Sequence, residues 1–200
     1  MVRVVVVDRR PAVRHGYEAI LAGAPGVAPA GSAAGRHDLW PLAYRTDPDV
    51  ALVADPEGDD GLVLCLRAAV RAPRTRLVLV DDEQDLAVAG AFAKVAAVVP
   101  AAVDVPTLLE TVRAVAGGES LLPPLTAAAR QRAAAHLGPH DRAILAMRLA
   151  GTPAREIAAM VGLSPPQLAG RCAAILAALR RRADPADLDE VLPSFVAAPA

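Results

Sequence analysis

Carboxylate side chains follow three of the most apolar runs in this sequence. Asp8 comes directly after Val2–Val7, Asp55 follows DVALVA, and Asp81–Glu83 follow RLVLV. Clustered carboxylate oxygens can bind a divalent cation or attract a basic partner. A solvated acidic loop is the alternative interpretation of the last two groups. Arg9-Arg10 lies beside Asp8, and an ion pair between these arginines and the acidic residues would take the place of a metal ion.

A second group of residues suits contact with nucleic acid. Residues 137–182 contain seven arginines and two acidic residues, net +5, although the whole chain has a net charge of −1. Gln167 has the donor geometry to recognise adenine, and Arg171 to recognise guanine or phosphate. Further phosphate contacts are expected from Arg142, Arg148, Arg155, Arg180, Arg181 and Arg182. A polyanion such as double-stranded DNA is therefore expected to meet this region, and a merely solvated basic face is the alternative.

Other chemistry is not indicated. The sequence has no paired nucleophile and base, no phosphate-binding glycine loop and no metal-ligand spacing, so neither an enzyme nor a bound cofactor or metal is expected. Cys65 and Cys172 lie in apolar periodic segments, which predicts buried thiols in a reducing cytoplasm. The chain begins without the features of a signal peptide and has no uninterrupted apolar stretch of roughly 18 residues, so a cytoplasmic protein without membrane contact is expected.

The elements that must position these groups alternate through the first 120 of the 200 residues. Strands are expected at 2–7, 26–30, 49–54, 76–80 and 96–99. Helices are expected from Pro11, within 32–44, over 62–72 and 85–92, and from Pro106. Prolines inside 26–30 and at Pro41 oppose regular structure there. Five strands alternating with five helices predict an α/β fold with a five-stranded doubly wound parallel sheet, whose ligand site lies at the carboxyl ends of the strands.

A smaller all-α unit is expected after Gly117-Gly118. Three helices are predicted at 139–149, 153–161 and 165–181, and the three-residue turn Gly162–Ser164 between the last two is typical of a helix-turn-helix. The apolar stripe of the last helix consists of Leu168, Cys172, Ile175, Leu176 and Leu179. The expected organisation is a sheet domain at 1–120, a helical linker at 121–136, the helix-turn-helix domain at 137–182 and an acidic, apolar tail at 183–200.

Several segments, taken in order, carry a family resemblance. They run from VRVVVVDRRPAVRHGYEAIL through DPDVALVADP and PTLLETVRAVAGGESLLPP to LGPHDRAIL and GTPAREIAAMVGLSPPQL. The chain resembles a two-domain response regulator of the NarL/LuxR type over nearly its whole length. LETVRAVAGGES is similar to the last helix and linker start of the family's receiver domain, and AREIAAMVGLS to its first DNA-binding turn. The resemblance implies a flavodoxin-like receiver followed by a LuxR-type helix-turn-helix.

The chain departs from this family at the site that accepts phosphate. The resemblance implies a phosphoacceptor aspartate at the end of the third strand and an acidic pair after the first strand that holds Mg²⁺. The pair here is Asp8 and Arg9, and the phosphoacceptor position falls on Ala54. Asp55 is one residue late, so its side chain would point to the opposite face of the strand unless a bulge or turn brought it back.

The two remaining positions of the site also differ. The family's switch hydroxyl falls on Val80, and the lysine that follows its fifth strand falls on Ala101. Asp8, Arg9, Asp55, Val80 and Ala101 therefore form a degenerate acidic pocket, and the resemblance implies an atypical response regulator with a pseudo-receiver that a kinase does not phosphorylate.

Two functions follow from the sequence. The first is a DNA-binding transcriptional regulator that works without aspartyl phosphorylation, with the receiver-like domain serving dimerisation or the sensing of a small ligand or partner. The second is a protein-interaction module with lost or weak DNA binding that pairs with another regulator or with transcription machinery. A homodimer, or a heterodimer with a related regulator, is expected because paired DNA half-sites imply a two-fold protein.

Overall fold

A five-stranded parallel sheet forms the centre of the larger domain. The computed structural model describes residues 1–54, 60–82 and 86–180. The strands lie in the order β2-β1-β3-β4-β5, as predicted for a doubly wound sheet. Their bounds are β1 Val2–Val7, β2 Val27–Ala33, β3 Val50–Val53, β4 Arg76–Val80 and β5 Ala97–Val99. Because β-branched valines dominate the central strands and both faces are covered, the side chains of β3 are buried throughout.

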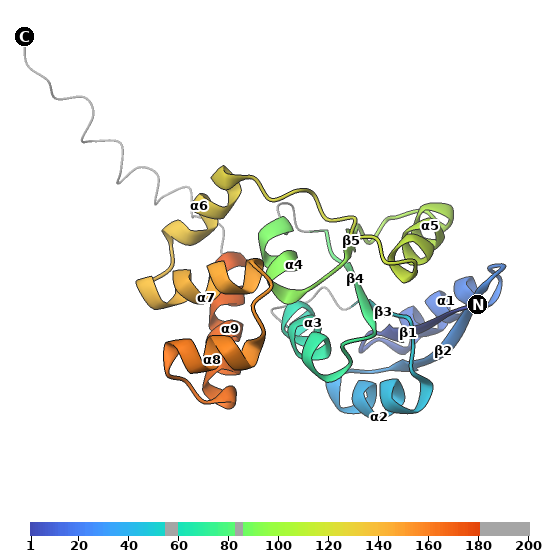
Figure 1. Cartoon of the computed structure of the whole chain (residues 1–200). Helices are drawn as coiled ribbons and strands as arrows, with labels where there is room; N and C mark the ends of the chain where they lie inside the picture. The colour runs from blue at the N-terminus through green and yellow to red at the C-terminus, as the bar shows by residue number, and fades with distance from the viewer. Residues whose placement is uncertain (55–59, 83–85, 181–200) are drawn as a thin grey trace, which may run out of the picture.

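Helices cover both faces of the sheet (Figure 1). On one face lie α1 Pro11–Ala22 and α5 Val105–Ala116; on the other lie α2 Arg36–Thr46, α3 Asp60–Arg71 and α4 Ala87–Ala93. Val4 and Val6 of β1 belong to the apolar cluster under α1 and α5, whereas Val5 and Val7 belong to the cluster on the opposite face. This alternation follows from the two-residue period of a strand.

Two segments that the prolines made doubtful are regular. β2 continues to Ala33 and contains Pro29, and α2 contains Pro41. In the sheet of the described residues β2 is an edge strand beside β1, so it tolerates a residue without an N–H group. Its register with β1 shifts between Val4 and Val5. In α2, Leu39 and Ala43 are buried on the side of the helix that faces the sheet. The stabilisation from this burial exceeds the cost of the backbone hydrogen bond that Pro41 cannot donate.

Between residues 121 and 180 the chain forms four helices: α6 Ala127–Ala135, α7 Pro139–Leu149, α8 Ala154–Val161 and α9 Pro165–Arg180. α8 ends at Gly162, whose φ of 67° is left-handed, and the chain then turns into α9. Glycine accepts this conformation without a steric penalty, so Gly162 closes the predicted helix-turn-helix. Leu168, Cys172, Ile175 and Leu176 of the predicted stripe are buried, and Leu179 is half-buried.

The two domains pack against each other. α4 contacts α6, α7 and α9, and α3 also contacts α9, an arrangement visible in Figure 1. The apolar cluster between the sheet and α3 continues without a break into the cluster that holds α7, α8 and α9 together. Within the described ranges, no helix is long and apolar enough to cross a membrane.

Candidate functional site

Asp8 lies at the carboxyl edge of the sheet, where β1 ends. Its side chain is fully buried, and its backbone N–H donates to the carbonyl oxygen of Ala33 at 3.2 Å. Ala54 follows β3 beside it, and the N–H of Ala54 donates to the carbonyl oxygen of Val7 at 2.8 Å. The parallel register of β1 and β3 therefore places residues 8 and 54 next to each other, as the sequence predicted for this edge.

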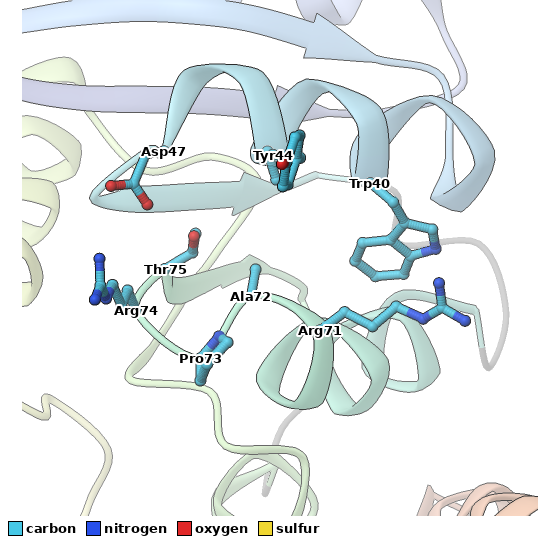
Figure 2. Close-up of a pocket in the computed structure, with 9 residues that line it drawn as sticks. Trp40, Tyr44, Asp47, Arg71, Ala72, Pro73, Arg74 and Thr75 are labelled. Atoms are coloured by element: carbon cyan, nitrogen blue, oxygen red, sulfur yellow. The ribbon is translucent and has the colours of Figure 1, made fainter.

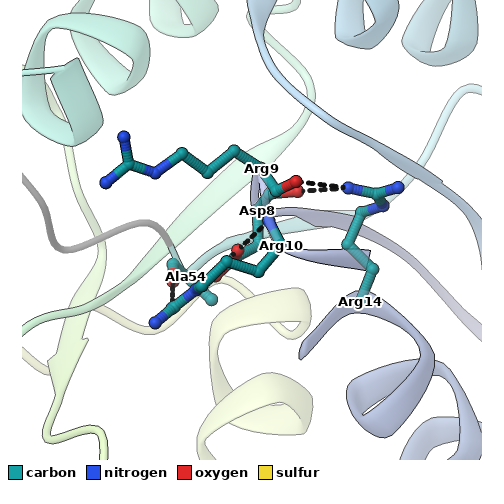
Figure 3. A network of polar contacts seen from close by, with 5 residues as sticks. All are labelled: Asp8, Arg9, Arg10, Arg14 and Ala54. Carbon is teal, nitrogen blue, oxygen red and sulfur yellow. Dashed lines mark hydrogen bonds and ion pairs between the residues drawn. The ribbon is translucent and has the colours of Figure 1, made fainter. Parts of the chain in front are cut away.

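The guanidinium group of Arg10 covers Asp8 (Figure 3). Its Nε donates to Oδ1 of Asp8 at 3.0 Å, and its Nη2 donates to Oδ2 at 2.8 Å. The same Nη2 donates to the carbonyl oxygen of Ala54 at 3.2 Å, and the backbone N–H of Arg10 donates to Asp8 Oδ1 at 2.6 Å. Such a two-point fork is the strongest form of an arginine–carboxylate pair. Here it offsets the free-energy cost of burying the Asp8 carboxylate away from water.

The resemblance placed Arg9 where the family holds Mg²⁺, but it is the guanidinium group of Arg10 that lies there against Asp8. Figure 3 shows the side chain of Arg9 directed away from Asp8, while Nη1 of Arg14 donates to the backbone oxygens of Asp8 and Arg9 at 2.7 and 3.2 Å. The local reason lies in Pro11, which starts α1 and leaves Arg10 as the extended N-cap residue, with φ −82° and ψ 115°. From this position its side chain reaches back over the end of β1. The run Asp-Arg-Arg-Pro was the sequence signal for it.

Three other positions of the degenerate pocket, Ala54, Val80 and Ala101, have side chains that can neither accept a phosphoryl group nor pair with one. Ala54 and Val80 are both buried, with 2% of their surface exposed. Ala101 is exposed, and its backbone N–H donates to Oδ1 of Asp82 at 2.7 Å. Asp55, the alternative acceptor, lies outside the described residues. At this edge the described residues include two buried carboxylates, Asp8 and Asp81, which pair with Arg10 and Arg180, and residue 54 offers no nucleophile.

These residues do not fit a magnesium ion. Mg²⁺ prefers an octahedron of oxygen ligands and takes one or two carboxylates from a protein. The carboxylate of Asp8 and the carbonyl oxygen of Ala54 both accept hydrogen bonds from Arg10, so a cation at this point would meet a guanidinium group. Within the described residues, no group of three or more histidine, cysteine or acidic side chains is placed to hold a metal ion.

The predicted base-reading residues lie on the exposed side of α9, and both also bond within the helix-turn-helix. Oε1 of Gln167 accepts from the backbone N–H of Ser164 at 2.8 Å, one half of a capping box. Nε of Arg171 forms an ion pair with Oδ1 of Asp141 on α7, and the Arg171 side chain is 50% exposed. Their outer faces remain accessible, whereas Ala169 and Gly170 between them offer no polar side chain.

The other arginines predicted to contact phosphate differ in their exposure and in their partners. Arg155 is exposed on α8, and Arg142 is exposed while donating to the carbonyl oxygens of Leu137 and Ala135. Arg180 instead reaches the larger domain, where its Nη2 lies 3.3 Å from Oδ2 of the largely buried Asp81. Arg181 and Arg182 lie outside the described residues.

Arg148 is not a phosphate contact in this arrangement, contrary to the sequence interpretation, because it is buried between the domains. Its Nη2 donates to the carbonyl oxygen of Phe92 at 3.0 Å, and its guanidinium carbon lies 5.6 Å from the centre of the Phe92 ring. Burial lowers the pKa of Arg148. Lys94, at the end of α4, has its pKa lowered by desolvation and then by the charge of Arg148. Hydrophobic periodicity alone gave no signal for this interface.

No protein-family model and no curated protein matches the chain, whereas solved structures do. RcsB from Salmonella enterica serovar Typhimurium, bound to promoter DNA in the presence of a phosphomimetic, has a TM-score of 0.54 at 18% identity, covering 94% of this chain and 98% of its own. The receiver domain of NarL from Mycobacterium tuberculosis has a TM-score of 0.53 at 26% identity, covering 59% of this chain and 98% of its own. A LuxR-family response regulator from Aurantimonas sp. SI85-9A1 has a TM-score of 0.54 at 23% identity, and the match covers 60% of this chain and 89% of that protein's chain. The fold is that of a receiver domain joined to a helix-turn-helix domain.

Proposed function

We propose that this chain is an atypical response regulator of the NarL/LuxR family, a cytoplasmic DNA-binding transcriptional regulator that works without aspartyl phosphorylation. In this proposal residues 1–120 are a pseudo-receiver used for dimerisation or for sensing a ligand or partner. Residues 121–136 are the linker, residues 137–182 bind DNA, and residues 183–200 form a tail.

One observation carries the independence from phosphorylation. The guanidinium group of Arg10 bonds both oxygens of Asp8 and the carbonyl oxygen of Ala54, where the family's chemistry needs a metal ion. The developing charge of a transferred phosphoryl group has to be stabilised by cations around a nucleophile, and residue 54 is an alanine. The pairing supports a domain in which a guanidinium group of the chain itself lies where the family holds a metal ion.

DNA binding is supported by the helix-turn-helix and by its charge. α8, the turn at Gly162 and α9 have the arrangement in which a second helix enters the major groove. Gln167 and Arg171 face solvent on α9, and Arg155 adds an exposed charge on α8. RcsB has been solved as dimers bound to DNA, and a similar homodimer, or a heterodimer with a related regulator, would give this chain the second half-site.

The phosphorylation part is tested by incubating the full chain with acetyl phosphate and Mg²⁺ and measuring its intact mass. We expect no added phosphoryl group in the wild-type protein, while a phosphorylatable response regulator treated in parallel gains one. A gain of one phosphoryl group on the wild-type chain would overturn independence from phosphorylation. An Asp55→Asn variant then shows whether that residue is the acceptor.

The DNA part is tested by salt-titrated binding to fragmented genomic DNA without any phosphodonor. Enrichment of inverted half-sites with two chains per site supports a dimeric regulator. The Arg171→Ala variant is expected to lose discrimination between sites, whereas Arg155→Ala weakens binding uniformly and flattens its salt dependence. An unchanged site preference in Arg171→Ala removes that residue from base readout.

A protein-interaction module is the second candidate, and the composition of α9 favours it. Ala169, Gly170 and Ala174 are small and exposed, and the polar residues Gln167 and Arg171 already bond within the module. Binding to DNA that vanishes by physiological salt would support this candidate, since nonspecific binding is dominated by phosphate contacts.

A further inference from the structure

A cavity of about 500 Å³ lies between α2 and the segment that joins α3 to β4 (Figure 2). Six polar or aromatic residues line it: Trp40, Tyr44, Asp47, Arg71, Arg74 and Thr75. Asp47 and Thr75 stand just before β3 and β4, so this end of the cavity is at the amino edge of the sheet. Asp8 occupies the carboxyl edge, and the cavity is therefore separate from the site described above. Its volume lies within the range of small-molecule sites, roughly 300–1,000 Å³.

Aromatic side chains are concentrated at this cavity. The chain has one tryptophan and two tyrosines, and Trp40 and Tyr44 both line it, one helical turn apart on α2. Tyr44 is 92% exposed, so its ring contributes almost nothing to the protein core. Flat aromatic faces that border an open cavity bind planar rings by offset stacking.

The charged groups of the cavity favour an anion. The guanidinium carbon of Arg71 lies 5.7 Å from the centre of the Trp40 ring, and Arg74 approaches from the opposite end. Asp47 is the one acidic lining residue, so the lining carries a net charge of +1. Figure 2 shows the hydroxyl group of Thr75 directed into the space between the two segments. Arginine forks bind carboxylate and phosphate oxygens in two-point geometry, and a hydroxyl group can donate to the same anion.

We propose that this cavity binds a planar aromatic molecule that carries one anionic group. The ring stacks against Trp40 and Tyr44, and the anion pairs with Arg74, since the guanidinium group of Arg71 already lies over the Trp40 ring. Binding of such a ligand would supply the sensing role of the receiver-like domain, and only that role rests on the proposed function. α3 carries Arg71 at its end and packs against α9, so the ligand would contact a helix shared with the DNA-binding module.

Trp40 provides the readout, because it is the only tryptophan of the chain. The full-length protein is titrated with 4-nitrobenzoate, an aromatic carboxylate, and separately with AMP, a nucleotide. Saturable quenching of Trp40 fluorescence is expected from at least one of them, and the probe that binds identifies carboxylate or phosphate as the anion. Calorimetry on the same samples confirms the stoichiometry of one ligand per chain.

Matched probes and variants distinguish binding at this site from nonspecific binding. 4-Nitrobenzamide keeps the ring without the charge, cyclohexanecarboxylate keeps the charge without the ring, and both are expected to bind at least about tenfold more weakly. Arg74→Ala is expected to weaken binding about tenfold, whereas Arg45→Ala, exposed on α2 outside the lining, leaves it unchanged. Absence of saturable binding, equal binding of the amide, or an unaffected Arg74→Ala variant would overturn the proposal. Genomic DNA binding is measured without these probes, so the two proposals fail independently.

Discussion

Arg10 and Asp8 form a two-point ion pair across the end of β1, with contacts of 3.0 and 2.8 Å between the guanidinium nitrogens and the carboxylate oxygens. The carboxylate is fully buried, while the arginine side chain remains 47% exposed. The pair is therefore asymmetric: the arginine can return to water, but the aspartate cannot. Removal of the arginine leaves a buried charge without its partner, which costs more than the pair itself contributes.

The Arg10→Ala variant should accordingly be less stable than the wild type. We expect its free energy of unfolding, measured by urea denaturation at pH 7, to fall by about 1–3 kcal/mol, since the lost bonds are charge-assisted and partly exposed. Arg10→Lys keeps the charge without the fork and should lie between the two. Arg45→Ala serves as the exposed control. Equal stability of Arg10→Ala and wild type would show that water replaces the guanidinium group without penalty.

Arg148 supplies a contrasting case, because its burial is incompletely compensated. Within the described residues, its Nε has no hydrogen-bond partner, although Nη2 bonds the carbonyl oxygen of Phe92. Arg148→Met should change the free energy of unfolding by less than about 1 kcal/mol, because methionine packs on the Phe92 ring without a desolvation penalty. Arg148→Ala should lower it by about 2 kcal/mol or more through the cavity it leaves. A methionine variant as unstable as the alanine variant would indicate that the Phe92 hydrogen bond dominates.

Asp141 restrains the predicted base-reading arginine. Its carboxylate pairs with Arg171, and it also adds negative charge beside α9. If the module binds DNA as proposed, Asp141→Asn should raise its affinity about two- to fivefold, the range given by an exposed ion pair. The measurement is a DNA titration at fixed salt, with Glu110→Gln on α5 as a control of equal charge change. Unaltered affinity in Asp141→Asn would mean that Arg171 does not leave Asp141 when DNA binds.

The two thiols give a dependence on pH. Burial raises the pKa of Cys65 from 9.0 to about 12, and it also raises the pKa of Cys172. At pH 8 only about one in 10⁴ Cys65 thiols is then ionised, so native protein should resist a thiol reagent that labels both cysteines after denaturation. Above pH 9 the two thiols hold fewer protons in the unfolded state than in the native state, so their contribution to stability falls as pH rises. Rapid native labelling of the Cys65→Ser variant would locate the reactive thiol at Cys172.

Much of the fold could be predicted because the spacing of apolar residues along the sequence indicates which side chains are buried. The bounds of β1 and β4 and those of α7 match the sequence prediction residue for residue, and each is delimited by charge, proline or glycine. β2 and α2 were less certain because a local rule about proline cannot include the tertiary packing that stabilises Leu39 and Ala43.

The sequence predicted the kind of site, a receiver-like edge without its phosphoacceptor, but not which arginine lies against Asp8. The alanine at residue 54 and the nearby positive charge were visible in the sequence, but the choice of Arg10 over Arg9 depends on the backbone direction before Pro11. The burial of Arg148 was missed for a different reason. A sequence shows which helix faces are apolar, whereas the meeting of α4 with α7 and α9 depends on how two finished domains fit together.

The unbroken apolar cluster that joins the sheet domain to the helix-turn-helix has a consequence for cooperativity. Phe92 and Ala93 of α4 belong to the same buried cluster as the C-terminal helices that α4 contacts, so separation of the domains exposes apolar surface on both sides at once. We therefore expect the opening of the interface to be coupled to local unfolding of α4, the seven-residue helix that contacts α6, α7 and α9. Amide hydrogens of α4 and α9 should therefore exchange with solvent as one unit.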